Sequence, residues 1–342
     1  MNFKGNKKQA SLLTVGSLLT ASLLSFSCAP NKSSEQQFSG QAESNSNIVG
    51  GVLADTNYQS SNGIVGLLIT SQNLLGQEQQ AICTGTLIDK RLVLTAAHCI
   101  AEPGLSSVIV FFAKEMQSAT QDRARFALTG TVHELFQAEI KPNDPNASLA
   151  NWHDIAMLVL NEDAPADVKP AKLAAAGTVL KKGGTLTLAG FGITTAVIRK
   201  EVKKNGKTII QELEGVGDGT LRQVDGMVIA NMANNNNEIV LDQKKKGACH
   251  GDSGGPAFLK NADGSMLQVG VTSRGLEKLG NCNVQSVYTS TIAHMDWIKT
   301  TSVDLLKQAE EILKKAAEEN KSAPASETPG TAPLVPVVAG TK

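Results

Sequence analysis

Short runs of β-forming residues, separated by Gly, Asn and Asp, recur along the chain from Ile48 to about Val287. The clearest runs are Gly63–Thr70, Cys83–Ile88, Val108–Ala113, Met157–Leu160, Thr185–Leu188, Val228–Ala230 and Gln268–Thr272. Many short strands at this spacing are typical of a β-barrel or a β-sandwich. Because helical periodicity is scarce before residue 290, the sequence predicts an all-β body.

The chain departs from this pattern at its C-terminal end and in one internal segment. From Ile292 onwards apolar residues recur at helical spacing, which predicts a C-terminal helix that continues as an extension over residues 301–320. Residues 321–342 are rich in Pro, Ala, Thr and Val, and we expect a disordered tail there. Within residues 193–219, Asn205-Gly206 separates two β-forming runs and predicts a protruding hairpin.

The first 30 residues have the parts of a secretory signal peptide. Three lysines precede residue 10, an apolar run continues to Phe26, and small residues follow. The run is short and diluted by Ser, Thr and Gly, which argues against a membrane-spanning anchor. Cys28 stands where a bacterial lipoprotein carries its lipidated cysteine, but Ser25 replaces the usual aliphatic residue, so lipidation and ordinary cleavage both stay open. Residues 31–47 read as a flexible pro-segment.

Composition limits the partners and cofactors of the chain. Basic and acidic residues number 32 each, so bulk charge attracts neither nucleic acid nor an acidic membrane. Aromatic residues make up 4%, few for a protein that stacks bases. Besides Cys28 there are four cysteines, which allow three pairings and favour an oxidising, extracytoplasmic location. None has CxxC spacing, so no zinc site is expected, and we expect a monomer without metal or cofactor.

Four motifs follow one another along the β-rich body. They are Ile48–Gly51 (IVGG), Leu94–Cys99 (LTAAHC), Asp154–Leu158 (DIAML) and Gly251–Pro256 (GDSGGP). In this order they resemble the trypsin-like serine proteases, over roughly residues 48–300, and we interpret the chain as a bacterial exported member. The resemblance implies two six-stranded antiparallel β-barrels with the active site between them, plus a C-terminal helix.

The resemblance also assigns the chemistry of peptide hydrolysis. It implies Ser253 as nucleophile, His98 as general base and Asp154 as the carboxylate that orients the imidazole. The backbone N–H groups of Gly251 and Ser253 would form the oxyanion hole, where a glycine permits the required backbone conformation. Protein or peptide substrates follow from these assignments.

Activation and disulfide pairing are implied in the same way. Cleavage before Ile48 would free an α-ammonium group that pairs with the Asp252 carboxylate, so the chain is expected to be a zymogen. The preceding residue is Asn47, which makes trypsin-like self-cleavage unexpected and leaves the activating protease unknown. The family pattern pairs Cys83 with Cys99 and Cys249 with Cys282.

The specificity pocket departs from that of relatives that cleave after Arg or Lys. Those relatives have an aspartate six residues before the nucleophile, where this chain has Gly247. The expected pocket walls are Ser273, Arg274, Gly275 and Ser286. A buried cation without a partner is costly, so we predict weak cleavage after Arg and Lys and a preference for an apolar P1 residue. Arg274 and His250 make an acidic P1 residue the alternative.

Two other functions compete with this interpretation. A catalytically inactive, protease-like binding module would usually lack a triad residue, and none is missing here. An esterase of the α/β-hydrolase type needs a Gly-x-Ser-x-Gly elbow and the order Ser, Asp, His, which this chain does not have. His133 and His294 match no motif and are interpreted as structural. His153 adjoins Asp154, but neighbouring residues on a strand point to opposite faces, so His153 is not expected to share a site with Asp154.

Overall fold

The computed structural model describes residues 48–136, 150–193, 198–204, 207–213, 219–244, 246–276 and 282–322. The predicted signal segment with Cys28, the pro-segment with Asn47, and residues 323–342 of the predicted tail lie outside the described residues. Within the described ranges, no helix is both long and apolar enough to cross a bilayer.

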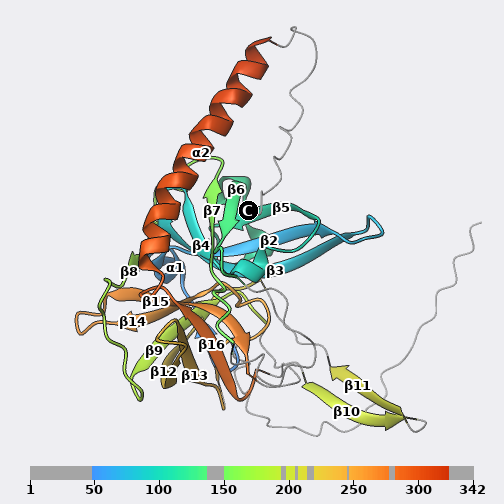
Figure 1. Ribbon diagram of the computed structural model, residues 1–342, viewed down its shortest axis with the longest axis vertical. Helices are drawn as coiled ribbons and strands as arrows, with labels where there is room; N and C mark the ends of the chain where they lie inside the picture. The colour runs from blue at the N-terminus through green and yellow to red at the C-terminus, as the bar shows by residue number, and fades with distance from the viewer. Residues whose placement is uncertain are drawn as a thin grey trace, which may run out of the picture. The chain divides into compact units, whose positions relative to one another are not determined.

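Six antiparallel strands close the first barrel (Figure 1). In barrel order they are β2 (Ile64–Gln72), β3 (Glu78–Asp89), β4 (Leu92–Thr95), β7 (Ala156–Leu160), β6 (Ala124–Val132) and β5 (Leu105–Phe111). β7 buries all five of its residues, because it pairs with β4 and β6 and is also contacted by the C-terminal helix. A strand covered on both faces reads as a continuous hydrophobic run, as AMLVL does here.

A second ring of six antiparallel strands forms the other barrel. Its order is β9 (Thr185–Gly190), β12 (Arg222–Ala233), β13 (Glu238–Asp242), β16 (Gln285–Ser290), β15 (Met266–Gly275) and β14 (Pro256–Lys260), and β14 pairs back onto β9. Outside the ring, β1 (Val52–Leu53) pairs with β12, and β8 (Lys172–Leu173) runs parallel to β15. The prediction of two six-stranded barrels is therefore confirmed.

The described helices are one short, one long and three single 3₁₀ turns. α1 (Thr56–Asn62) was not predicted, and it begins at Asp55, whose side chain accepts a hydrogen bond from Tyr58 N–H at 2.6 Å. α2 (Met295–Ser322) is one continuous C-terminal helix, as expected, and it buries Leu305 and Ala309 in the core of the first barrel. The 3₁₀ turns are η1 (Ala97–Cys99), η2 (Met116–Ser118) and η3 (Gln121–Arg123).

The segment that departs from the barrels forms the predicted hairpin. β10 (Ile198–Lys204) and β11 (Lys207–Leu213) pair antiparallel as a two-stranded sheet of their own. The register runs from Ile198 opposite Leu213 to Lys204 opposite Lys207, so two residues connect the strands. Asn205-Gly206, on which the hairpin prediction rested, lies outside the described residues.

Candidate active site

His98 and Asp154 are brought together by two paired strands of the first barrel. η1 carries His98 just after β4, and Asp154 lies two residues before β7. Because Thr95 of β4 pairs with Ala156 of β7, both side chains lie at the same barrel edge. Asp154 Oδ2 lies 2.7 Å from His98 Nδ1, and Asp154 Oδ1 accepts from the His98 backbone N–H at 2.9 Å. With the Nδ1 proton held in this contact, Nε2 is the nitrogen that can accept a proton.

Opposing effects set the pKa values of this pair. Burial would lower the pKa of His98, but the charge and hydrogen bond of Asp154 outweigh burial and raise it above its ordinary value. Burial would raise the pKa of Asp154, yet His98 and the hydroxyl of Ser273 outweigh it and lower this pKa. Ser273 Oγ donates to Asp154 Oδ2 at 2.7 Å, and Thr289 Oγ1 donates to the Asp154 carbonyl at 2.9 Å. The second barrel therefore helps to orient the carboxylate.

Ser253 lies in the tight loop that precedes β14. The loop contains Gly251 at φ +91° and Gly254 at φ +81°, a backbone region that favours glycine. A Cβ on Gly254 would lie 2.3 Å from the backbone oxygen of Thr84 in β3, so the loop approaches the first barrel as closely as backbone allows. The GDSGG pattern thus matches a local requirement for glycine.

Thr84 fixes this loop to the first barrel. Its backbone N–H donates to Ser253 O at 2.8 Å, and its hydroxyl donates to Gly251 O at 2.9 Å. The backbone N–H of Phe191 donates to the same hydroxyl at 3.0 Å. Thr84 is wholly buried and joins the two barrels at the nucleophile loop, a role that no sequence motif indicated.

His98 and Ser253 line one pocket of about 260 Å³. In the part of the chain that the structure describes, no hydrogen bond joins the Ser253 hydroxyl to the His98 ring. This contact is often long in unliganded enzymes and shortens when substrate binds. The pocket therefore contains both candidate residues, His98 and Ser253, in an arrangement in which the hydrogen bond between them is not yet formed.

The same pocket contains most of the predicted specificity residues and one that was missed. Ser273, Arg274, Gly275 and Ser286 all line it. Gly247 is not among the lining residues; Gln243 is, and a Cβ on Gly247 would lie 2.3 Å from Gln243 Oε1. Gln243 is buried, and its amide donates to Ala248 O at 3.0 Å and Cys282 O at 3.1 Å. Within the described part of the chain, its Oε1 accepts no hydrogen bond.

Arg274 is compensated by the protein itself. Its guanidinium donates to both carboxylate oxygens of Glu238, at 2.8 and 3.1 Å, and to Ala150 O at 2.9 Å. It also lies over the Trp152 ring, 4.5 Å from the centroid. Glu238 is buried, so the pair is a shielded ion pair. Arg274 thus adds bulk to the pocket wall while its charge is directed at Glu238. His250, which is exposed, also lines this pocket.

Both predicted disulfides are present. Cys83 bonds to Cys99 directly beside His98, and Cys249 bonds to Cys282 beside the nucleophile loop. The bonded cysteines are 16 residues apart in the sequence in the first bridge and 33 residues apart in the second. Each bridge therefore restricts the chain beside one of the two candidate catalytic side chains, His98 and Ser253.

Ile48 and Asp252 are both buried at 1% exposure. Val49 forms a bridge with Gly247, whose N–H donates to Val49 O at 2.8 Å, and Ile48 packs in the core of the second barrel. Asp252 accepts from Gly192 N–H at 2.9 Å and Cys249 N–H at 2.8 Å, and burial still raises its pKa to about 7. The motif that begins at Ile48 is thus seated in the barrel whose loop carries Asp252.

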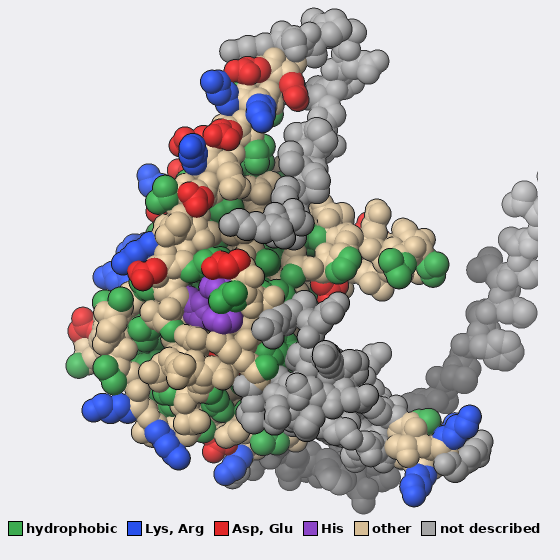
Figure 2. Space-filling model, viewed as in Figure 1, with side chains coloured by type: hydrophobic (Ala, Val, Ile, Leu, Met, Phe, Trp, Pro, Cys, Tyr) green, Lys and Arg blue, Asp and Glu red, His purple; other side chains and the backbone are tan. Residues whose placement is uncertain are grey.

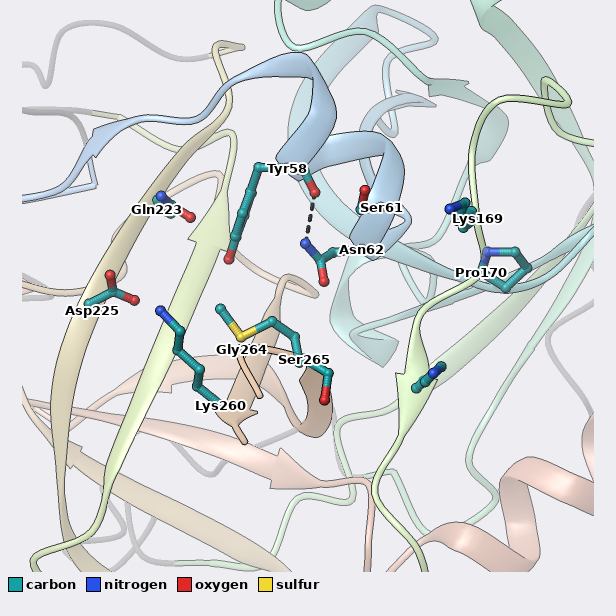
Figure 3. A pocket seen from close by; sticks show the side chains of 12 residues that line it. Tyr58, Ser61, Asn62, Lys169, Pro170, Gln223, Asp225, Lys260, Gly264 and Ser265 are labelled. Carbon is teal, nitrogen blue, oxygen red and sulfur yellow. Dashed lines mark hydrogen bonds between the residues drawn. The ribbon is translucent and has the colours of Figure 1, made fainter. Parts of the chain in front are cut away.

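Another cavity lies away from these residues. It measures about 530 Å³ and is lined by α1 and by residues from the second barrel, including Tyr58, Asp225 and Lys260 (Figure 3). None of His98, Asp154 and Ser253 lines it. The candidate active-site pocket is therefore identified by its side chains and not by its size.

The comparisons with known proteins agree with this geometry. A family model described as Trypsin matches residues 48–298. A trypsin of Phaedon cochleariae is 30% identical over 63% of this chain and 77% of that protein. Kallikrein-8 of Homo sapiens is 26% identical, over 67% of this chain and 80% of the relative.

Phenoloxidase-activating factor 3 of Holotrichia diomphalia is 28% identical over 64% of this chain, and the match spans 63% of that protein's length, less than two thirds. These relatives are animal proteins, so they do not support the bacterial source that the N-terminal segment suggested. With the two barrels and the paired His98 and Asp154 beside Ser253, the matches show that the chain belongs to the trypsin family of serine proteases.

Proposed function

We propose that the chain is an exported serine endopeptidase that hydrolyses peptide bonds in protein or peptide substrates. The observation that carries this proposal is the 2.7 Å contact between His98 Nδ1 and Asp154, in a pocket that Ser253 shares. Serine is a weak nucleophile at neutral pH and needs an adjacent oriented base, and this arrangement supplies one.

The proposed reaction uses the described groups in two half-reactions. Ser253 Oγ attacks the scissile carbonyl carbon while His98 Nε2 takes the hydroxyl proton, and the N–H groups of Gly251 and Ser253 stabilise the oxyanion. His98 then protonates the leaving amine, and an acyl-enzyme remains. Water repeats the sequence, releases the acid and restores the Ser253 hydroxyl. Asp154 stays ionised throughout, which its lowered pKa supports.

We propose further that the chain is synthesised as a zymogen, cut before Ile48 by a protease of unknown identity. The support is a buried Ile48, a buried Asp252 without a cationic partner among its hydrogen bonds, and the bridge that holds Val49 against Gly247. Export through the N-terminal signal fits the disulfides, and lipidation of Cys28 or ordinary cleavage remain alternative outcomes. We expect the mature enzyme to be monomeric.

The pocket favours uncharged P1 side chains. Gln243 contributes an amide where a cation would need a carboxylate, and Glu238 is already paired with Arg274. Because the Arg274 charge is compensated in this way, an acidic P1 residue gains little from it, which removes the main reason for the acidic alternative. We therefore propose an apolar P1 preference.

Covalent labelling tests the proposed function. Protein cut before Ile48 should react with a fluorophosphonate probe at Ser253 and should cleave a mixed peptide library. Ser253→Ala should lose both properties, whereas Ser118→Ala, at an exposed serine of η2, should keep both. A folded, correctly cut protein that neither reacts nor cleaves would instead support the inactive binding module.

A further inference from the structure

Three histidines lie together outside the pocket that holds the triad. His133 follows β6, His153 lies shortly before β7, and His294 lies in the turn that leads into α2. A ring nitrogen of each lies within 4.8 Å of those of the other two. His133 and His294 are buried and His153 is half-buried. On the face drawn in Figure 2, histidine side chains reach the surface at one place, beside acidic side chains.

The hydrogen bonds of His294 fix its tautomer. Its Nδ1 donates to the carbonyl of Ser290 at 2.8 Å, so the proton is on Nδ1 and Nε2 carries a lone pair, which is hydrogen-bonded to His153 in the metal-free protein. Nε2 is directed at His153 Nδ1, 3.0 Å away. A metal-ligating histidine usually donates its other N–H to a carbonyl or carboxylate, which fixes the tautomer and the ring orientation. His294 already has this arrangement.

Asn151 can do the same for His153. Its side-chain amide lies 2.9 Å from His153 Nε2, and its Oδ1 is buried and has no hydrogen-bond partner among the residues that the structure describes. A half-turn of the amide exchanges oxygen and nitrogen, after which Oδ1 accepts a hydrogen bond from His153 Nε2–H. The buried oxygen is then satisfied, and the Nδ1 lone pair faces His294 Nε2. Two lone pairs then converge on one point, which a cation would stabilise.

His133 completes the group. Its ring stacks on His153 with centroids 4.9 Å apart and lies edge-on to His294 at 5.2 Å. Its Nδ1 accepts from Leu135 N–H at 3.1 Å and lies 3.8 Å from a carboxylate oxygen of Glu134. Coordination through Nε2 requires the proton on Nδ1, which costs the Leu135 N–H its acceptor and turns Nδ1–H toward the Glu134 carboxylate. This is the carboxylate–histidine relation common in metal sites.

The spacing of the ring nitrogens agrees with this arrangement. Nitrogen ligands lie about 2.0–2.1 Å from zinc, so neighbouring ligands of a tetrahedral site are roughly 3.3 Å apart. The present spread of up to 4.8 Å closes with small ring movements.

We propose that His133, His153 and His294 form a binding site for one transition-metal dication of the Zn²⁺ type, with a fourth position for water. Three imidazoles suit Zn²⁺, Cu²⁺ or Ni²⁺, whereas Mg²⁺ and Ca²⁺ prefer oxygen ligands. The cysteine spacing that argued against zinc does not bear on this group. The site does not depend on the proposed proteolysis, so both can be tested separately.

Binding is measured on the full chain carrying Ser253→Ala, which removes autolysis. Isothermal titration with Zn²⁺ after chelation should show one ion per chain, and X-ray absorption should show a nitrogen-rich shell at about 2.0–2.1 Å. Mg²⁺ at the same concentration should not compete. Asn151→Ala should weaken binding by about 10- to 100-fold, the usual effect of losing an outer hydrogen bond, and His153→Gln or His294→Gln should weaken it more.

Matched variants separate this site from the catalytic histidine. His250→Gln should bind Zn²⁺ like the parent. If His98→Gln abolishes binding while His153→Gln and His294→Gln keep it, the ion belongs to the triad and the proposal is wrong. Unchanged affinity in the double variant His153→Gln/His294→Gln, or no binding to the folded parent, would equally overturn it. Because His294 is buried, circular dichroism of each metal-free variant must first match the parent; His153→Gln, at the half-buried position, carries the test if His294→Gln unfolds.

Discussion

At the scale of single residues, the protonation of His98 controls the proposed reaction. Its imidazole must be neutral to accept the Ser253 proton, and Asp154 raises its pKa above 6.5. We therefore expect kcat/KM to fall as pH decreases through a value above 6.5 and to level off at higher pH. Asp154→Asn removes the charge and the correct tautomer, and should reduce kcat by on the order of 10⁴.

The pH profile of each variant measures this effect. In Asp154→Asn the remaining activity should titrate at a lower pH, because burial still lowers the His98 pKa and the opposing carboxylate is gone. A profile with an unchanged midpoint in Asp154→Asn would show that another group is being titrated.

Ser273 is a positioning residue by the same reasoning. Its hydroxyl donates to the buried Asp154 carboxylate at 2.7 Å, and a hydrogen bond to a charged group contributes about 1.5–3 kcal/mol. Ser273→Ala should lower kcat by about 10- to 100-fold, and Ser273→Thr should restore part of it. Ser286→Ala, at a serine of the same pocket, should change KM more than kcat. If both alanine variants change only KM, and by the same factor, Ser273 lines the pocket and does not position Asp154.

Gln243 sets the expected specificity. We predict a higher kcat/KM for matched peptides with Leu or Phe at P1 than for those with Arg, Lys or Glu. Gln243→Glu keeps the shape and adds a carboxylate, so it should raise the Arg-to-Leu ratio of kcat/KM. A parent enzyme that prefers Arg over Leu, Phe and Glu would contradict the pocket assignment.

At the scale of elements, α2 divides into a packed and a solvated part. Leu305 is 1% exposed in the core of the first barrel, whereas Leu313 is 37% exposed. Leu305→Ala should lower the free energy of unfolding by about 2–5 kcal/mol, and Leu313→Ala by about 0.5 kcal/mol or less. Urea unfolding measures both. If the two variants lose the same stability, the helix is not anchored through its first half.

Local patterns explain which elements could be predicted. β9 and β10–β11 follow from β-forming runs and from Asn205-Gly206, since those signals act over a few residues. α1 was missed because Thr56–Asn62 has no apolar periodicity. Its stability comes from the Asp55 cap, from Gly63 in the left-handed region at its end, and from burial of Gln59, none of which makes a repeating pattern.

At the scale of the whole molecule, contacts between distant segments were the part that sequence could not supply. The candidate triad could be named from sequence because a motif marks each of its members. Thr84 bridges to a loop more than 160 residues away, and His153 and His294 are separated by 141 residues. Their proximity depends on how the strands close into barrels, which no local pattern encodes. Sequence spacing pointed to Gly247 as a pocket residue, whereas Gln243 lines the pocket, again because the contact depends on the folded barrel.

The proposed activation also belongs to this scale, because it would link the new terminus at Ile48 to the pocket through Asp252. In the uncut chain, burial raises the Asp252 pKa from 3.8 to about 7. The unfolded chain ionises first, so the uncut protein should lose stability as pH rises from about 4 to about 7, by about 4 kcal/mol in all. After cleavage, the Ile48 ammonium would favour the ionised Asp252 carboxylate and lower its pKa. The cut protein should therefore not lose stability over this pH range.

Urea unfolding of cut and uncut protein at pH 5 and pH 8 tests this coupling. Both samples carry Ser253→Ala to prevent autolysis and Asn47→Lys so that trypsin can cut before Ile48. In the uncut chain, Asp252→Asn should remove the fall in stability between pH 5 and pH 8. In the cut chain the same substitution leaves a buried ammonium without its partner and should cost about 3–5 kcal/mol. If Asp252→Asn changes cut and uncut protein equally at both pH values, Asp252 is not the partner of Ile48.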